Sequence, residues 1–273
     1  MILNFINWNA NPEIFHLGGL SVRWYGLLFA AGFYVGYLVM ERFFKKENVP
    51  IAVLDKLAMY MIVSTVIGAR LGHCLFYEPA YYLSNPIEIL YIWHGGLASH
   101  GAAIGIIFAL FLFSKTQKKS FWWVIDRIVI VVALAGFFIR TGNLMNSEIY
   151  GHTTNLPWGF VFLRDHETIP RHPTQIYEAL CYLALFFVLR WYYYKKEGNP
   201  NNGFLFGSFL IILFSVRFVI EFLKETQVNF EKEMLLNMGQ LLSIPFIIAG
   251  IVLVVLANKD KLKEKTNYKY SGK

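Results

Sequence analysis

Charged residues are scarce in this 273-residue chain. They make up only 16% of it, whereas hydrophobic residues make up 56%. An ordinary soluble domain has about 25% charged and 45–50% apolar residues, so a soluble enzyme of this length is excluded, and a disordered chain is excluded as well. The aromatic content of 18%, together with long runs that carry no charge, indicates a polytopic α-helical membrane protein.

Cysteine is also rare, because Cys74 and Cys181 are the only two. A secreted module held together by disulfides is therefore excluded. Both cysteines lie in apolar segments, where we expect small buried side chains and no disulfide between them. The sequence further lacks an HExxH motif and an Asp-rich metal motif, and we expect neither a metal ion nor another cofactor.

Seven segments are long enough to cross a bilayer, which takes about 20 largely apolar residues. The predicted spans are residues 20–41, 57–77, 89–114, 120–140, 173–194, 203–223 and 234–257. The seventh is the clearest, since no charge occurs from Met234 to Asn258. The fold class predicted is an all-α membrane protein, with a single transmembrane domain over residues 1–258 and a basic cytoplasmic tail over residues 259–273.

The basic residues predict the orientation of these spans. Of the 25 Lys and Arg residues, 17 fall on one side of the membrane, 6 fall on the other side and 2 lie within spans. The positive-inside rule places the richer side in the cytoplasm. The N-terminus is thus predicted outside, the C-terminus inside, and residues 141–172 form a long periplasmic connection between spans four and five. The net charge of +7 is then explained by attraction to anionic lipid headgroups, and no nucleic-acid partner is expected.

Ionisable residues within the predicted spans cluster toward one side of the membrane. Inserting each of these side chains into the membrane costs at least about 2.5–3.5 kcal/mol on insertion scales, so each is expected to have a structural or functional role. They are Arg70, His73, His94, His100, Arg140, Glu178, Arg217 and Glu221. The predicted topology places all of them in the outer half or at its rim, which indicates a cavity open to the outer leaflet and not a path across the whole membrane.

Two of the motifs that contain these residues have both a structural and a functional interpretation. Arg217 and Glu221 are four residues apart on one helix and share a face. They form either a neutralising ion pair or an arginine fork held ready for an anion. His100 lies in HGGLASHGAAIG, whose four glycines serve either close helix packing or a thinned helix that a lipid headgroup can approach.

Three further motifs remain open in the same way. The stretch RTGNLMNSEIYG, from Arg140 to Gly151, is either a polar helix end or a hydrogen-bonding cup for a phosphate and glycerol hydroxyls. Arg70 is either a structural counter-charge or part of the same site. Tyr25 is either an interfacial aromatic anchor or a functional residue.

Four stretches of the sequence together carry a family resemblance. They are VRWYGLLF from Val22, HGGLASHGA from His94, RTGNLMNSEIYG from Arg140 with RHPTQIYE from Arg171, and RFVIEFLKE from Arg217. In this order they resemble the bacterial prolipoprotein diacylglyceryl transferase family. The resemblance implies a seven-span enzyme of the bacterial inner membrane whose active site faces the periplasmic leaflet.

The reaction implied by the resemblance moves the diacylglyceryl group of phosphatidylglycerol to the lipobox cysteine thiol of a preprolipoprotein, and glycerol phosphate leaves. The expected partners are therefore phosphatidylglycerol, the lipobox of the signal peptide and membrane lipids. The resemblance implies catalytic roles for His100, as a proposed base, and for Arg140, Arg217 and Glu221. It implies phosphatidylglycerol binding by Tyr25, Arg140, Asn143, Glu148, Gly151 and Arg217.

A transporter or flippase that faces the outer leaflet is the alternative. Such a protein is expected to line both membrane halves with polar residues and, in many families, to show inverted repeats. Neither feature is evident in the sequence, and both considerations favour an enzyme that handles a lipid phosphate.

Overall fold

The computed structural model describes residues 5–18, 20–225 and 234–262. These residues gather into two compact units. The first unit falls within Met1–Val39 and Asp126–Lys263, and the second within Met40–Ile125. The predicted basic tail lies outside the described residues from position 263 onward, and the prediction of one transmembrane catalytic domain over residues 1–258 stays a prediction.

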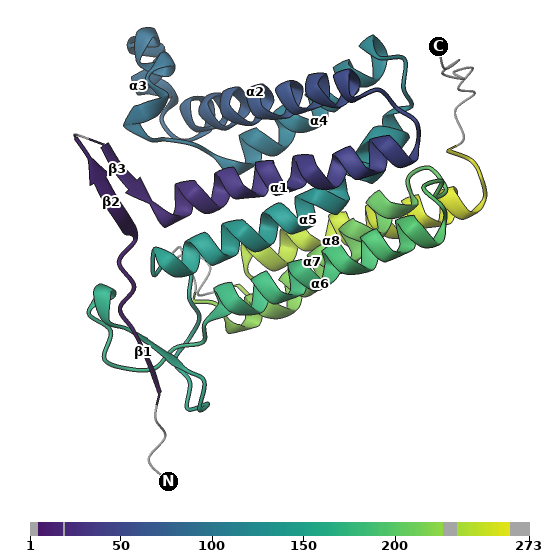
Figure 1. Cartoon of the computed structure of the whole chain (residues 1–273). Helices are drawn as coiled ribbons and strands as arrows, with labels where there is room; N and C mark the ends of the chain where they lie inside the picture. Colours follow the sequence, from purple (N-terminus) through teal and green to yellow (C-terminus); the bar gives the residue numbers. More distant parts are fainter. Residues whose placement is uncertain (1–4, 19, 226–233, 263–273) are drawn as a thin grey trace. The chain divides into compact units, whose positions relative to one another are not determined.

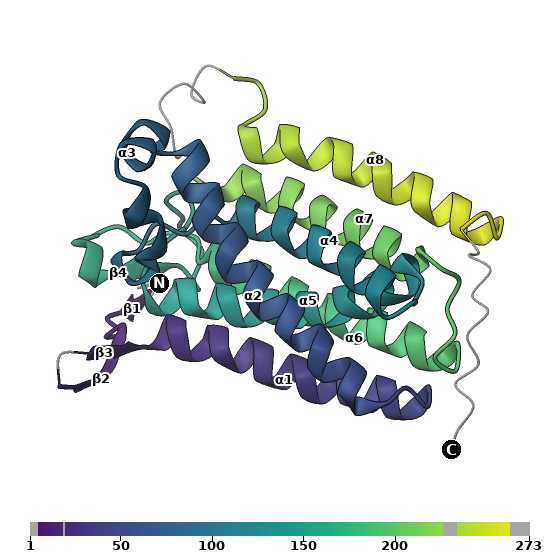
Figure 2. The same ribbon diagram turned by 90° about the horizontal axis from the view of Figure 1, so that it is seen from above.

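Helices dominate both units (Figures 1 and 2). The α-helices are α1 (Trp24–Lys46), α2 (Ile51–Phe76), α3 (Pro79–Ser84), α4 (Ser99–Thr116), α5 (Phe121–Met145), α6 (Thr174–Lys195), α7 (Phe204–Ile220) and α8 (Met238–Asn258). Short 3₁₀ turns are η1 (Pro86–Leu90), η2 (Ile92–His94), η3 (Leu163–Asp165) and η4 (Glu221–Leu223). The strands are β1 (Ile6–Trp8), β2 (Glu13–Leu17), β3 (Leu20–Arg23) and β4 (Phe160–Phe162).

Six helices in the described part of the chain are long and apolar enough to cross a membrane, namely α1, α2, α4, α5, α7 with η4, and α8. The prediction of a mostly helical, multi-pass membrane protein is confirmed at this level. The predicted span 173–194 is a helix, α6, but it is not among the six. Its sequence carries Glu178 and Arg190 and ends in WYYYK, which lowers its apolarity. The count of seven spans therefore stays a prediction.

The predicted third span is wrong at its start. Instead of a helix from residue 89, the chain forms the turns η1 and η2 and begins α4 only at Ser99. Gly95 and Gly96 have φ values of 86° and 72°, a left-handed conformation that glycine adopts without strain and that a right-handed helix cannot contain. The motif around His94 is therefore a turn, and His100 lies in the first turn of α4.

The helices α5, α6, α7 and α8 make up the larger part of the first unit. Figures 1 and 2 show α6 beside α7 and α7 beside α8, and these helices are in contact. Gly207 and Gly250 allow the closest approach, since a Cβ atom on Gly207 would meet the Gly250 carbonyl oxygen at 2.9 Å. At one end of the four helices, the buried Asp126 of α5 accepts hydrogen bonds from the backbone N–H groups of Gly203 and Phe206 at 2.7 and 2.8 Å. It thereby caps α7, which lacks a side-chain cap of its own.

The predicted periplasmic connection folds against the other end of this unit. Its strand β4 pairs in parallel with β1, and the Trp8 indole donates to the Leu144 carbonyl at 3.0 Å, next to the end of α5. Antiparallel bridges join Gly151 to Lys224 and Thr153 to Arg171. The connection that follows α5 is thus tied by backbone hydrogen bonds to the end of α7.

The second unit is built on the helix pair α2 and α4. A Cβ atom on Gly68 would meet the Gly101 carbonyl oxygen at 2.5 Å, and one on Gly105 would meet the Ser64 carbonyl oxygen at 2.7 Å. Small residues at this spacing let two helix backbones touch. The packing interpretation of the glycines in this motif therefore holds for Gly101 and Gly105.

Candidate active site

A buried charge network lies in the first unit, where the ends of α5 and α7 meet the start of α6. The Arg140 Nε atom is 2.7 Å from Oε2 of Glu178, whose side chain is fully buried. The other oxygen of Glu178 accepts a hydrogen bond from Lys224 Nζ at 2.8 Å. One carboxylate thus pairs with two cations, and the Arg140 side chain remains 15% exposed.

A second branch of the network leaves Arg140 toward the connection. Arg140 Nη1 donates to Asn143 Oδ1 at 3.1 Å, and Asn143 Nδ2 donates to Glu148 Oε1 at 2.7 Å. The Gln175 amide in turn donates to the Glu148 backbone carbonyl at 2.6 Å. Helix α5 continues to Met145, so Arg140 and Asn143 lie on the same helical face, three residues apart, and both point toward Glu148.

Glycine shapes the network at two positions. A Cβ atom on Gly142 would meet the Tyr25 ring at 2.8 Å, and this close contact packs Tyr25 of α1 against α5. A Cβ atom on Gly151 would clash with the Leu223 carbonyl oxygen and would meet Thr174 Cγ2 at 2.8 Å. Gly151 is therefore the residue that allows the connection to touch the ends of both α6 and α7.

Glu221 does not pair with Arg217 among the described residues. Its carboxylate lies 3.5 Å from Lys224 Nζ instead. The backbone keeps α-helical spacing between the two, since the Glu221 N–H still bonds the Arg217 carbonyl. The 3₁₀ turn η4 begins at Glu221 and brings Lys224, three residues on, to the same side as the Glu221 carboxylate. Gly239 at the start of α8 leaves room for the Glu221 carboxyl group, which a Cβ atom there would meet at 2.6 Å.

The first unit thus holds seven of the eight predicted site residues. Arg140, Asn143 and Glu148 form one hydrogen-bonded set, Tyr25 packs against the same stretch of α5, and Gly151 meets the end of η4. Glu221 joins through Lys224. Arg217 lies one helical turn before Glu221 on α7.

The eighth predicted site residue, His100, belongs to the second unit and is exposed in the first turn of α4. Arg70, which is 3% exposed, fixes the segment before it. Its guanidinium donates to the carbonyl groups of Glu88, Ile89 and Gly95 at 2.5, 2.9 and 2.6 Å. Arg70 is thus a clamp for the turn that leads into α4.

Two members of the network were not predicted as site residues. Glu178 was recognised only as a charge within a span, and Lys224 was assigned to a loop. The signal that points to Lys224 is its spacing in RFVIEFLKE, three residues after Glu221 and seven after Arg217, which places it near one face of a helix. Its partner Glu178 lies on another helix, so only the fold brings the two together.

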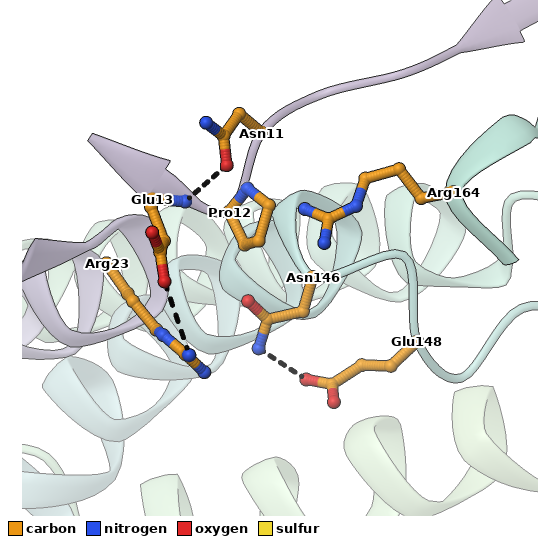
Figure 3. A pocket seen from close by; sticks show the side chains of 7 residues that line it. All are labelled: Asn11, Pro12, Glu13, Arg23, Asn146, Glu148 and Arg164. Atoms are coloured by element: carbon orange, nitrogen blue, oxygen red, sulfur yellow. Dashed lines mark hydrogen bonds and ion pairs between the residues drawn. The ribbon is translucent and has the colours of Figure 1, made fainter. Parts of the chain in front are cut away.

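An open cavity of about 480 Å³ adjoins the network on the side of the connection. Its lining residues are Asn11, Pro12, Glu13, Arg23, Asn146, Glu148 and Arg164. Figure 3 shows the side chains of Arg23 and Arg164 approaching this space from opposite sides, with Asn146 bonded to Glu148. Glu148 is therefore shared between the cavity and the branch that leads to Arg140.

Titratable groups of the connection shift in line with their surroundings. Partial burial, together with the carboxylates of Asp165 and Glu167, raises the pKa of Tyr150 to about 12. Tyr150 thus stays a hydrogen-bond donor to Glu167, at 3.3 Å. Partial burial, with a smaller contribution from His152, lowers the pKa of His172. Within the described residues, no group of three or more His, Cys, Asp or Glu side chains is placed to hold a metal ion.

Known proteins resemble this chain over nearly its whole length. The family described as prolipoprotein diacylglyceryl transferase matches residues 12–256. A relative from Tolumonas auensis is 49% identical over 94% of this chain and 99% of its own length. One from Porphyromonas gingivalis is 46% identical over 96% and 98%. Both are named phosphatidylglycerol–prolipoprotein diacylglyceryl transferase. The chain belongs to the prolipoprotein diacylglyceryl transferase family.

Proposed function

We propose that this protein transfers the diacylglyceryl group of phosphatidylglycerol to the lipobox cysteine of a preprolipoprotein. The names of its relatives, at 43–49% identity, give the two substrates. The observation that carries the site assignment is the buried network of Arg140, Glu178 and Lys224, with its branch through Asn143 to Glu148.

The bonds that change require a stabilised anion and a proton acceptor. The cysteine sulfur attacks carbon 3 of the diacylglyceryl group, and a C–S bond forms. The bond between that carbon and the phosphate oxygen breaks, its electron pair stays on the oxygen, and glycerol phosphate leaves. The thiol proton must go to a base, because a thiol of pKa about 8.5 is only a few per cent ionised at neutral pH.

Arg140 is suited to stabilise the charge that develops on the phosphate. An ion pair with Glu178 and a hydrogen bond to Asn143 hold the Arg140 guanidinium in place and leave other N–H donors for a phosphate oxygen. If Glu178 had no other partner, it would cancel the charge of Arg140. Because Lys224 also pairs with Glu178, that carboxylate is shared between two cations and does not neutralise Arg140 alone.

The remaining site residues take the roles that the family implies. Arg217 is a second contact for the phosphate, Glu221 holds Lys224, and Tyr25, Asn143, Glu148 and Gly151 shape the headgroup site. His100 is proposed as the base that accepts the thiol proton. These assignments rest on the motifs and on the contacts above.

The proposed topology has seven spans, with the active site toward the periplasmic leaflet of the bacterial inner membrane. Helix α6 has 22 residues, about 33 Å at 1.5 Å per residue, which suffices for a hydrocarbon core of about 30 Å. It starts at the network, where Gln175 meets Glu148. The loop after it, at Gly198, meets Arg127 near the start of α5. In the first unit α6 thus runs the length of its neighbours, which supports a seventh crossing.

The decisive experiment uses the purified full chain in detergent micelles with phosphatidylglycerol and a lipobox peptide. Mass spectrometry should show a peptide that gains one diacylglyceryl group, and a peptide with Ser in place of the lipobox Cys should gain nothing. Folded protein that modifies neither peptide would sink the proposal. If the same protein in vesicles moves phosphatidylglycerol between leaflets, the alternative of a flippase takes its place.

A further inference from the structure

We propose that the open cavity beside Glu148 binds the free glycerol phosphate that the reaction releases, as a product site that adjoins the lipid site at Arg140 and shares Glu148 with it. This inference rests on the proposed function. The cavity is polar, since all its lining residues except Pro12 carry polar side chains. Its volume of about 480 Å³ lies in the lower part of the range for small-ligand pockets, about 300–1,000 Å³.

The donors and acceptors around the cavity match a small phosphorylated polyol. Arg164 has no carboxylate within ion-pair distance in the described part of the chain; its one hydrogen bond there runs from Nη1 to the Ala10 carbonyl at 3.5 Å. Arg23 contacts Glu13 only through Nη2, at 3.4 Å, so its other N–H groups are left for a ligand. Two guanidinium groups can therefore meet one phosphate from opposite sides.

Acceptors for hydroxyl groups lie opposite these donors. Glu148 Oε1 already receives the amides of Asn143 and Asn146, and its second oxygen is available to a ligand hydroxyl. The Oδ1 atom of Asn146 is buried and has no hydrogen-bond partner among the described residues, and an unpaired buried acceptor needs a donor. An anion that carries no hydroxyl would use the arginines and leave both of these acceptors unused.

The connection to Arg140 explains why the ligand is a product. Arg140, Asn143 and Glu148 form one continuous chain of hydrogen bonds, so the cavity begins where the proposed headgroup site ends. A polar cavity of this size does not accommodate two acyl chains. Once the carbon–oxygen bond breaks, glycerol phosphate is the one fragment that can leave the membrane and move into it.

The test measures inhibition of transfer by added sn-glycerol 1-phosphate in full-length protein. We expect Arg164→Gln and Arg23→Gln each to raise the inhibition constant at least fivefold, while the apparent KM for phosphatidylglycerol changes less than twofold. Arg190→Gln, the same charge change near the far end of α6, is the matched control and should leave inhibition as in the wild type. Inorganic phosphate should inhibit at least fivefold more weakly than glycerol phosphate.

Four results would overturn the proposal. They are the absence of inhibition in the wild type, equal inhibition of the wild type and both variants, equal potency of inorganic phosphate, and a KM for phosphatidylglycerol that rises in parallel with the inhibition constant. The last result would assign the cavity to the lipid headgroup. Calorimetric titration of glycerol phosphate into the wild type and Arg164→Gln separates this question from the proposed function, because Arg164-dependent binding is measured whether or not the peptide is modified.

Discussion

At the scale of single residues, the site depends on how two cations share one carboxylate. Glu178 is fully buried and Lys224 is 5% exposed, so hydration stabilises neither charge to a large extent. A buried charge is costly unless it is paired, and each member of this network is held in place by the charge of another. The chemistry of Arg140 therefore depends on residues that need not touch the substrate.

Replacing Arg140 or Arg217 by Lys should lower kcat/KM for transfer more than tenfold, about 1.4 kcal/mol of transition-state stabilisation. An ammonium group is a point charge and cannot reproduce the planar fork that holds a phosphate and a neighbouring side chain at once. Steady-state kinetics with phosphatidylglycerol measures this, and Arg190→Lys is the control. Turnover near the wild-type value in both variants would refute recognition of the phosphate by a guanidinium fork.

Glu178→Gln should destabilise the protein by about 3–5 kcal/mol, the range for breaking a buried pair, because it leaves Arg140 and Lys224 facing each other without their anion. The double variant Glu178→Gln/Lys224→Gln should recover part of that loss, since it removes one of the two cations. Thermal unfolding in detergent, analysed as a double-mutant cycle, gives the coupling. If the effects of the two substitutions were additive, the pair would not be coupled.

At the scale of helices, glycine decides which backbones can touch. Helix α2 meets α4 through Gly68 and Gly101, and a Cβ atom on Gly101 would clash with the Gly68 carbonyl oxygen. This contact, with the Arg70 clamp, fixes the first turn of α4 and therefore the position of His100 within the second unit. The same four glycines that interrupt an apolar run in the sequence thus do two things: Gly95 and Gly96 turn the chain, and Gly101 and Gly105 pack it.

Gly101→Ala should lower stability by about 1–3 kcal/mol, the usual cost of overpacking, because the added methyl group meets backbone and not a movable side chain. Gly26→Ala in α1 is the matched control: a Cβ atom there meets nothing within 4 Å, and Ala is the better helix former by up to about 1 kcal/mol. Unfolding temperatures of both variants in the same detergent check the pair. Equal effects at the two positions would contradict the close contact between α2 and α4.

At the scale of the whole molecule, orientation in the membrane connects the site to its substrates. The basic residues of the sequence predict that the connection over residues 141–172 lies outside. In the first unit this connection folds onto the end that carries Arg140 and Lys224. The proposed active site is therefore predicted to face the periplasmic side, where the proposed lipobox substrate would reach it.

Cysteine labelling tests this orientation. Asn155→Cys, in the exposed connection, should react with a membrane-impermeant thiol reagent in cells whose outer membrane has been opened, and Lys118→Cys, between α4 and α5, should react only after the inner membrane is lysed. Both positions are exposed, so access to the reagent and not burial decides the result. The reverse pattern would invert the topology and move the site to the cytoplasmic face.

The labelling requires a cysteine-free background, and we expect Cys74→Ala/Cys181→Ala to keep most of its transfer activity. Both native cysteines are free thiols, and the attacking sulfur in the proposed reaction belongs to the substrate. Cys74 is fully buried, so a modest loss of stability from the small cavity is expected. A double variant that folds but transfers nothing, or a lipid adduct trapped on either thiol, would indicate a covalent intermediate on the enzyme.

The sequence by itself determined the class of the protein and most of its helices. A hydrophobic run predicts a membrane span without information about the helices beside it, because lipid is the solvent around each span. For this reason six predicted spans recur as apolar helices. The four motifs together carried the family resemblance, and the family is confirmed. Orientation follows from charge counts but stays a prediction until it is labelled.

Only the tertiary structure decided which charges meet. The spacing predicted that Arg217 and Glu221 share a helical face, but the Glu221 carboxylate instead meets Lys224, which the 3₁₀ turn η4 brings to its side. The pairing of Arg140 with Glu178 joins two helices separated by the long connection, a distance along the chain that periodicity does not bridge. Side-chain partners between helices depend on packing in three dimensions, and packing is the property that a local pattern of residues leaves open.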